Sequence, residues 1–308
     1  MSVLNHERRG LSLVELAVVL ALLGLIGTMI GSTMVRQQRF YRGAAQLLAA
    51  REEVRDAMEL LSTDIRGLSS ADTVRLMADS AIEFFASIGS SVICQTTANE
   101  VGLPAAQPSA NTLSAFLLQP DTGDLALFYN DSGGGPNHWE RHRIAGLTSR
   151  SLAASCPAAS GFSDQSDLDA GHKGFLLTLA TPPSPAVGVG TPVRFVRRGR
   201  YSFYRAADGK WYLGYRRCNA LGASVCGTIQ PLSGPYRPYS GIRRTTGFLL
   251  EYFNAAGLQL DATSEPLSPA RVDITARSES PQRMVVEGRA VSYSDSATIS
   301  VAVRNRSP

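Results

Sequence analysis

The sequence lacks the short motifs that identify most enzymes. It contains no P-loop, no HExxH zinc motif, no G-x-S-x-G nucleophile turn and no dinucleotide fingerprint placed between a strand and a helix. Its most enzyme-like cluster, His138-Trp139-Glu140-Arg141-His142, alternates as a surface strand would. We therefore expect neither catalysis nor a cofactor.

Charge is missing from Leu16 to Val35. This run is about as long as a helix that crosses a hydrocarbon core, at roughly 1.5 Å per residue. A short basic leader with Arg8 and Arg9 precedes it, and Glu15 stands at its start. A charged side chain inside a membrane segment costs about 2.5–3.5 kcal/mol, so Glu15 needs a partner or a shallow position.

A basic leader, then Gly10, the hydrophobic Leu11 and Glu15, resembles the prepilin-type signal of type IV pilins and type II secretion pseudopilins. The resemblance implies cleavage between Gly10 and Leu11 by a prepilin peptidase and N-methylation of Leu11. The new ammonium would pair with Glu15 within or between subunits. The resemblance also implies a cytoplasmic leader, a single pass through the inner membrane and a periplasmic head, followed by incorporation into a pilus or pseudopilus.

Two plainer interpretations compete with this resemblance. An ordinary secretory signal has a basic start and an apolar stretch, but an acidic residue inside that stretch is unusual and no small-residue cleavage site closes it. A plain single-pass anchor stays open as an alternative, although it gives no reason for Glu15.

The helix is expected to continue beyond the membrane segment. We divide the chain into a leader (1–10), a transmembrane helix (11–35), an amphipathic stem (36–67) that stops at Gly67, and a β-rich head (68–308). A helix from Leu11 to about Arg66 would be roughly 80 Å long. Small residues fall on one stripe of its first half, at Ala17, Ala21, Gly24, Thr28 and Gly31. Positions expected on the buried face of its second half are Phe40, Ala44, Leu47, Val54, Met58, Leu61, Ile65 and Leu68.

The head is rich in β signals, so the predicted fold class is α+β, a pilin-like lollipop with an antiparallel sheet packed on the stem. Asp208-Gly209 is a hairpin signal between two predicted strands. The segment 88–192 is expected to be a loop-rich elaboration with a few added strands. Predicted strands are Val193–Val196, Arg200–Arg205, Lys210–Arg217, Phe248–Phe253, Arg271–Thr275, Met284–Val286 and Ala297–Val303. The helix ending Asp64-Ile65-Arg66 and the order of these strands resemble minor pilins of the PilW type and J-type minor pseudopilins.

Four cysteines lie beyond the membrane segment and allow three pairings. If the head is exported they should be oxidised, and we favour Cys94 with Cys156 and Cys218 with Cys226. A zinc site is the alternative, but the sequence has no CxxC pair and no histidine at ligand spacing from the cysteines.

Two further ligand hypotheses have weaker support. Asp121, Asp124 and Asp131 match no calcium loop, so we interpret them as solvated turn residues and expect no metal. The net charge of +4 is mild, yet arginines and aromatics alternate in the hairpin 193–217. DNA could bind such a surface if its arginines converged on one uncovered face. If they do not converge, these arginines are solvated side chains on the exposed face of a sheet.

Two classes of function remain. The first, which we favour, is a minor pilin that primes assembly of a type IV pilus with other minor and major pilins, with a type II secretion pseudopilin as its alternative. The second is a membrane-anchored periplasmic binding domain. Gly10 and Glu15 favour the first class, since the second gives no reason for either residue.

Overall fold

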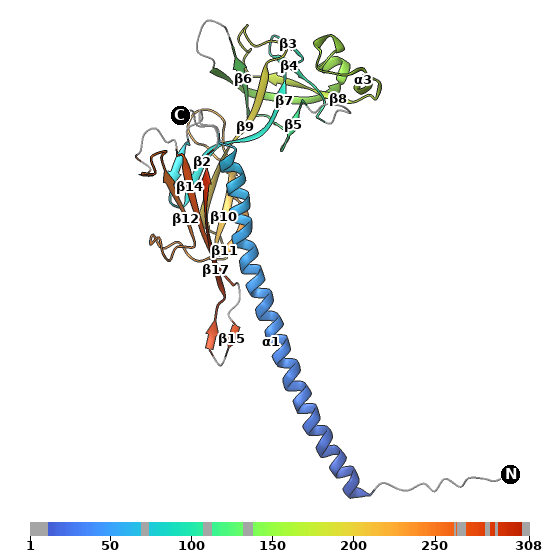
Figure 1. Ribbon diagram of the computed structural model, residues 1–308, viewed down its shortest axis with the longest axis vertical. Helices are drawn as coiled ribbons and strands as arrows, with labels where there is room; N and C mark the ends of the chain where they lie inside the picture. The colour runs from blue at the N-terminus through green and yellow to red at the C-terminus, as the bar shows by residue number, and fades with distance from the viewer. Residues whose placement is uncertain are drawn as a thin grey trace, which may run out of the picture.

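The computed structural model describes residues 12–68, 74–106, 113–131, 138–261, 263, 269–280, 284–286 and 289–303. Within these residues, one long helix forms a stem and an antiparallel sheet forms a head with two lobes (Figure 1). The chain is therefore an α+β protein, as the sequence predicts.

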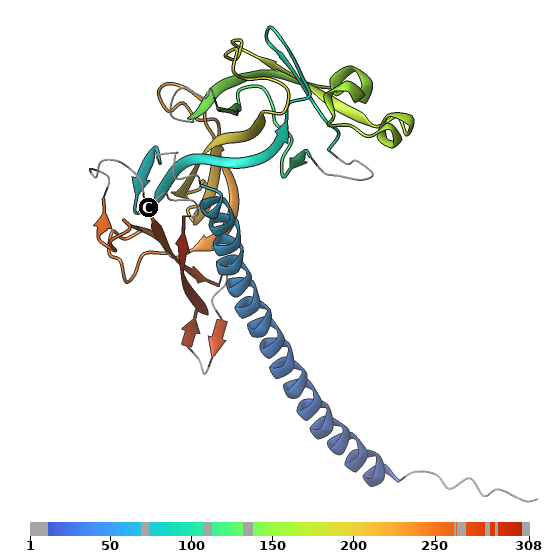
Figure 2. The same ribbon diagram turned by 45° about the horizontal axis from the view of Figure 1, so that its top comes forward.

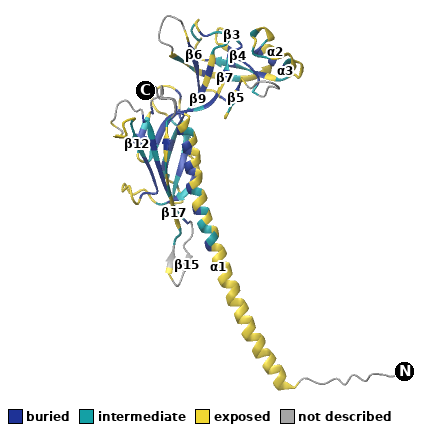
Figure 3. Ribbon diagram, viewed as in Figure 1, coloured by how far each residue is buried: buried dark blue, intermediate teal, exposed yellow. Residues whose placement is uncertain are grey.

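The stem is α1, Leu13–Arg66, a continuous helix of 54 residues. Its first part is exposed on all sides, and its buried face begins at Gly43 (Figure 3). Gly67 ends the helix, as predicted, and its N–H donates to the carbonyl of Thr63. Of the predicted face, Val54, Met58, Leu61, Ile65 and Leu68 are buried. Phe40 is not: its side chain is 72% exposed, because the sheet does not extend that far down the stem.

The stem lobe is the part of the head that packs on α1. The helix and the sheet enclose one apolar core that includes Leu61, Ile65, Phe84, Phe248 and Ile274. The strands of this lobe are β1 (Leu76–Ala78), part of β2 (Ala81–Val92), part of β9 (Pro192–Arg205), β10 (Trp211–Arg217), β11 (Gln230–Tyr236), β12 (Phe248–Phe253), β13 (Gln259–Leu260), β14 (Arg271–Glu279) and β17 (Ser294–Ala302). A separate hairpin joins β15 (Met284–Val286) to β16 (Arg289–Val291).

The distal lobe lies beyond the end of α1 and is richer in strands than the sequence indicates for 88–192 (Figure 1). It has its own core, which includes Ile93, Leu103, Phe128, Ile144 and Phe195. Its elements are β3 (Gln95–Thr97), β4 (Glu100–Leu103), β5 (Ala115–Phe116), β6 (Leu125–Asn130), β7 (His138–Ser151), α2 (Leu152–Ser155), the 3-10 turn η1 (Ala158–Ser160), α3 (Gln165–Asp169) and β8 (Lys173–Leu179).

Strands β2 and β9 run through both lobes and pair with each other along almost their whole length (Figure 2). On its other edge, β9 pairs with β6 in the distal lobe and with β10 in the stem lobe. The sequence predicts two strands here, Val193–Val196 and Arg200–Arg205, with the interval 197–199 between them. The structure has one strand, and a Cβ at Gly199 would lie 2.4 Å from the ring of Tyr215. The glycine therefore makes room for a neighbouring side chain and does not break the strand.

Candidate functional site

The expected processing site, Gly10 and Leu11, lies outside the described residues. The first described residues form a capping box at the start of α1. The backbone N–H of Ser12 donates to the Glu15 carboxylate at 3.1 Å, and the Ser12 hydroxyl accepts from the Glu15 N–H at 3.2 Å. Glu15 therefore satisfies an N–H that the helix itself leaves without a partner. Its carboxylate also lies in the first turn, where the helix dipole favours negative charge.

The apolar part of α1 exposes large side chains around its whole circumference, from Leu13 to Val35. It is the one described helix that is long and apolar enough to cross a membrane. The hydroxyls of Thr28, Ser32 and Thr33 donate back to helix carbonyls at 2.8–2.9 Å, so they need no water. An added Cβ at Gly24, Gly27 or Gly31 would touch no described atom within 4 Å, so no contact with the described residues requires these glycines.

Both disulfides of the head have the pairing that we favoured from the sequence. Cys94 pairs with Cys156 across 62 residues, and Cys218 pairs with Cys226 across eight. The sulfurs of the second pair and the Glu83 carboxylate lie within 4.8 Å of one another, the geometry of a small metal site. The two sulfurs are bonded to each other, so they are not available as thiolate ligands.

A buried ionic cluster surrounds Glu83 on β2, whose side chain is fully buried. Arg198 and Arg200 on β9 each contact a different oxygen of this carboxylate at 2.6–2.7 Å. Burial alone would raise the pKa of Glu83, but hydrogen bonds from Ser224, Arg200 and Arg198 hold that pKa below its usual value. Arg198 also donates to the carbonyls of Asn219 and Gly222. The cluster thus fixes the disulfide loop 218–226 against the sheet.

A second cluster surrounds Asp124, which is 1% exposed. Arg197 binds its two oxygens at 2.9 and 2.7 Å, and Arg217 donates to it at 2.9 Å. Arg217 also contacts Asp121 at 3.0 Å. Asp121 and Asp124 therefore form a structural cluster with two arginines, and the expectation of a solvated turn residue is wrong for Asp124, whereas Asp131 is exposed as such a residue would be.

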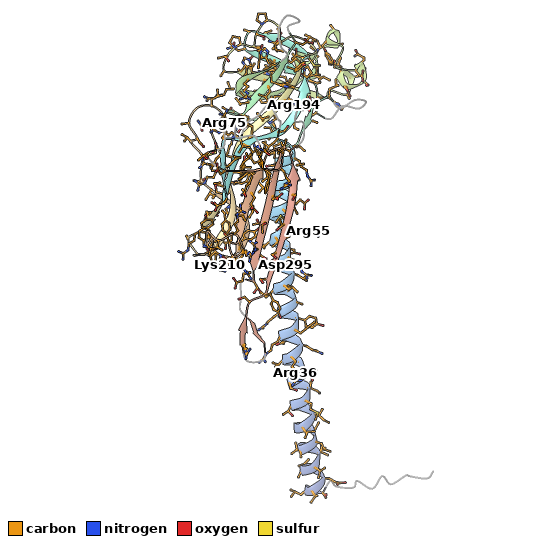
Figure 4. The ribbon with its side chains drawn as sticks, turned by 60° about the vertical axis from the view of Figure 1, so that its left-hand side comes forward. Arg36, Arg55, Arg75, Arg194, Lys210 and Asp295 are labelled. Atoms are coloured by element: carbon orange, nitrogen blue, oxygen red, sulfur yellow. A yellow bond between two sulfur atoms is a disulfide. The ribbon has the colours of Figure 1, made fainter. Side chains whose placement is uncertain are left out.

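The hairpin arginines do not converge on one uncovered face. Arg197 lies beside α1, whereas Arg198 and Arg200 point to the opposite face of β9. Arg194 lies over the ring of Trp139 in the distal lobe, far from Lys210 at the other end of the stem lobe (Figure 4). This distribution argues against a DNA-binding hairpin.

The histidine-containing cluster of β7 holds the loop that contains Ser184 against the strand through hydrogen bonds to Glu140. Glu140 accepts hydrogen bonds from Asn130 and from the backbone and hydroxyl of Ser184, and it contacts His142 at 3.3 Å. Burial alone would raise the pKa of Glu140, but these hydrogen bonds hold it at about 2. A carboxylate held so firmly in its charged form is a poor general acid.

A groove lies between the end of α1 and the distal lobe. Its volume is about 710 Å³, and it was not predicted from the sequence. Asp64 and Tyr201, which are hydrogen-bonded to each other, line its floor with Tyr215. Burial raises the pKa of Asp64, and the bond from Tyr201 offsets this only in part.

Sequence reasoning missed the clusters around Glu83 and Asp124 as well as the groove. One signal was available: Glu83 interrupts the apolar run Ile82–Phe85, and an acid inside a buried strand needs a cationic partner. The partners lie more than 100 residues away, so their identity required the strand pairing. No family model matches the sequence, and neither the curated proteins nor the solved structures include one that is significantly similar.

Proposed function

We propose that the chain is a minor pilin that primes assembly of a type IV pilus. The observation that carries this proposal is Glu15, which stands in the first turn of an exposed apolar helix and follows the junction Arg9-Gly10-Leu11. A pilus subunit needs a helix that lies in a membrane before assembly and packs against other helices afterwards. The glycines and the back-bonded hydroxyls of α1 suit both environments.

The distal lobe favours a place near the filament tip over one repeated along the shaft. It extends beyond the end of α1 and adds a second core to the head (Figure 1). A subunit repeated along a shaft must fit its head into a tight helical lattice, whereas a subunit at the tip escapes that limit. The same reasoning prefers a pilus to the related type II secretion pseudopilus, which remains the alternative.

Processing is the first test. N-terminal mass analysis of the membrane-extracted protein should find a chain that begins with N-methylated Leu11, with residues 1–10 removed. A strain without prepilin peptidase is the control and should retain the leader. An intact leader in a strain with active peptidase would end the proposal.

Copy number is the second test. Deleting residues 11–308 should sharply reduce the number of surface filaments while the major subunit stays in the inner membrane. Quantitative immunoblotting of sheared filaments should find that this chain is present at a small fraction of the abundance of the major subunit. An abundance comparable to that of the major subunit would rule out the priming role.

A further inference from the structure

We propose that the groove between α1 and the distal lobe binds a positively charged amphipathic helix of a partner protein. This inference does not rest on the proposed function, because it concerns the surface of the head alone. Several parts of the chain line the groove: α1 forms one wall, the segment after β5 adds Leu117 and Leu118, and β2, β9, β10 and β11 supply the remaining residues.

Exposed leucines from separate parts of the chain meet in this groove. Leu60 is 41% exposed, Leu117 81%, Leu118 55% and Leu232 37%. Contiguous apolar surface of this kind marks interaction sites on proteins that are otherwise polar outside. The segment after β5 is fixed in position, because the N–H groups of Leu117 and Leu118 both donate to the carbonyl of Ile88, at 2.9 and 3.2 Å. These backbone hydrogen bonds therefore hold Leu117 and Leu118 in place in the lining of the groove.

The charge of the groove selects a cationic partner. Asp56 and Glu59 line its rim, and neither forms an ion pair with any described residue. Asp64 adds a third carboxyl at the floor. Among the described residues that line the groove, Arg197 is the one cation, and Asp124 already neutralises it. The groove is therefore acidic on a chain whose net charge is +4, so the bound segment should supply Lys or Arg.

The shape of the groove favours a helix as its occupant. Asp56, Glu59, Leu60 and Thr63 lie at spacings of three, four and seven along α1, which places them on one stripe of the helix. A second helix that lies along this stripe can insert apolar side chains among the leucines and place its basic residues against Asp56 and Glu59. The volume of about 710 Å³ accommodates several side chains and exceeds what a single one would fill.

Site-specific photo-crosslinking of the full-length chain in the producing cell tests this proposal. A photoreactive amino acid replaces Leu118, and a matched control replaces Leu258, which is 66% exposed but lies on a turn of the stem lobe. Mass spectrometry then identifies the crosslinked segment. We expect a helical segment of another protein, with aliphatic residues at helical spacing and Lys or Arg within one turn of them. Leu258 should not yield this product.

Charge reversal provides the second arm. Asp56→Lys combined with Glu59→Lys should lower the yield at position 118 about tenfold, and reversal of the partner's basic residues should restore it. Glu100→Lys is the control, since Glu100 is exposed but lies on β4, outside the groove. All three substituted residues are exposed, and an unchanged melting temperature would show that the fold is intact.

Crosslinks to lipid, to a second copy of this chain or to a segment without basic residues would overturn the proposal. An absence of crosslinks at position 118, or equal yields in the variants and the control, would do so too.

Discussion

The carboxylate of Asp64, on the last turn of α1, accepts a hydrogen bond from the hydroxyl of Tyr201 on β9. Burial raises the pKa of both groups, and the neighbouring Asp64 charge raises that of Tyr201 further. The pair joins the end of the stem to a strand that runs through both lobes. Glu53 makes a similar connection lower on the helix, where its carbonyl accepts from the Tyr236 hydroxyl at 2.6 Å.

Removing the Tyr201 hydroxyl should therefore destabilise the junction of stem and head. Tyr201→Phe leaves a partly buried carboxyl without its donor, and we expect a loss of about 1–3 kcal/mol in the free energy of unfolding. Because the folded pKa of Asp64 is raised above 3.8, its contribution to stability is largest at low pH and falls as the pH rises through the raised value. The loss in Tyr201→Phe should accordingly be greater at neutral pH, where a charged carboxylate loses its donor.

Thermal unfolding at neutral and acid pH measures this difference. Tyr239→Phe is the matched control, because its hydroxyl donates to Asp79 at 2.6 Å at an exposed site. That substitution should change stability little. Equal losses of stability in the two variants would show that the hydrogen bond between Tyr201 and Asp64 stabilises the fold no more than an exposed one does.

Neutralising Glu83 should be among the most damaging single changes in the head. Glu83→Gln leaves Arg198, which is 6% exposed, without its counter-charge, and breaking a buried pair in this way costs about 3–5 kcal/mol. Asp295→Asn removes an ion pair too, but Asp295 and Arg51 lie 3.6 Å apart where the stem meets the sheet, and their side chains are 37% and 61% exposed. It should cost less than about 1 kcal/mol. Comparable melting temperatures for the two variants would contradict this ranking.

The Glu140 cluster should make the distal lobe sensitive to acid. The pKa of Glu140 falls from an ordinary 4.5 to about 2. The contribution of its carboxylate to stability is therefore complete above about pH 4.5 and is lost as the pH falls toward 2. The shift sets an upper limit of about 3–4 kcal/mol on this contribution, and solvent screening lowers it. Glu140→Gln should lower stability at pH 7 and flatten the acid dependence. Trp139 fluorescence in a Trp211→Phe background reports on this lobe. Glu100→Gln is the control, because Glu100 is exposed in the same lobe and lies outside this cluster, and it should leave the stability at pH 7 unchanged.

The two disulfides should differ in their effect on stability. Cys94–Cys156 closes a loop of 62 residues and Cys218–Cys226 one of eight. By loop entropy, removing the first should cost about 4 kcal/mol and removing the second about 2.5 kcal/mol. Paired Cys→Ser variants and chemical denaturation measure both losses. Non-reducing peptide mapping of the protein isolated from the producing cell should recover these two pairs, and free thiols or exchanged partners would refute the pairing.

We expect the charge of Glu15 to matter more for incorporation into filaments than its capping hydrogen bond to Ser12 does. A glutamine can replace glutamate in a capping box, so Glu15→Gln keeps the bond to the Ser12 N–H and removes only the charge. We expect Glu15→Gln and Glu15→Leu to insert into the membrane but to enter filaments poorly, whereas Ser12→Ala should assemble nearly normally. Immunoblots of sheared filaments and membranes give the ratio. Normal incorporation of Glu15→Gln would assign the role to capping.

Local signals in the sequence predicted the elements that depend on local contacts. The apolar run and the periodicity after it placed α1, and Asp208-Gly209 predicted the hairpin between β9 and β10, where Gly209 has a φ of 79°. Phe40 was assigned to the buried face because periodicity shows which residues share a face but not where the covering sheet ends.

The remaining features depend on contacts between distant segments. Strand β6 lies between β9 and β7, and its pairing with Val193–Val196 joins segments almost 70 residues apart. Local patterns indicate individual strands but not how they pair, so the segment 88–192 was expected to be loop-rich with a few strands and its core was not foreseen. The groove has the same origin, since its leucines come together only when the two lobes are in place.

The shared strands also determine how the head carries a mechanical load. Strands β2 and β9 pair from Ala81–Ser202 to Val92–Pro192, with one irregularity between Ser87 and Gly89. A pull that separates the distal lobe from the stem acts along these strands. The covalent backbones of both strands then carry the load, and the hydrogen bonds between the two strands need not open. We therefore expect force applied at the outer end of the head to reach the stem lobe through two continuous strands, with little stretching between the lobes.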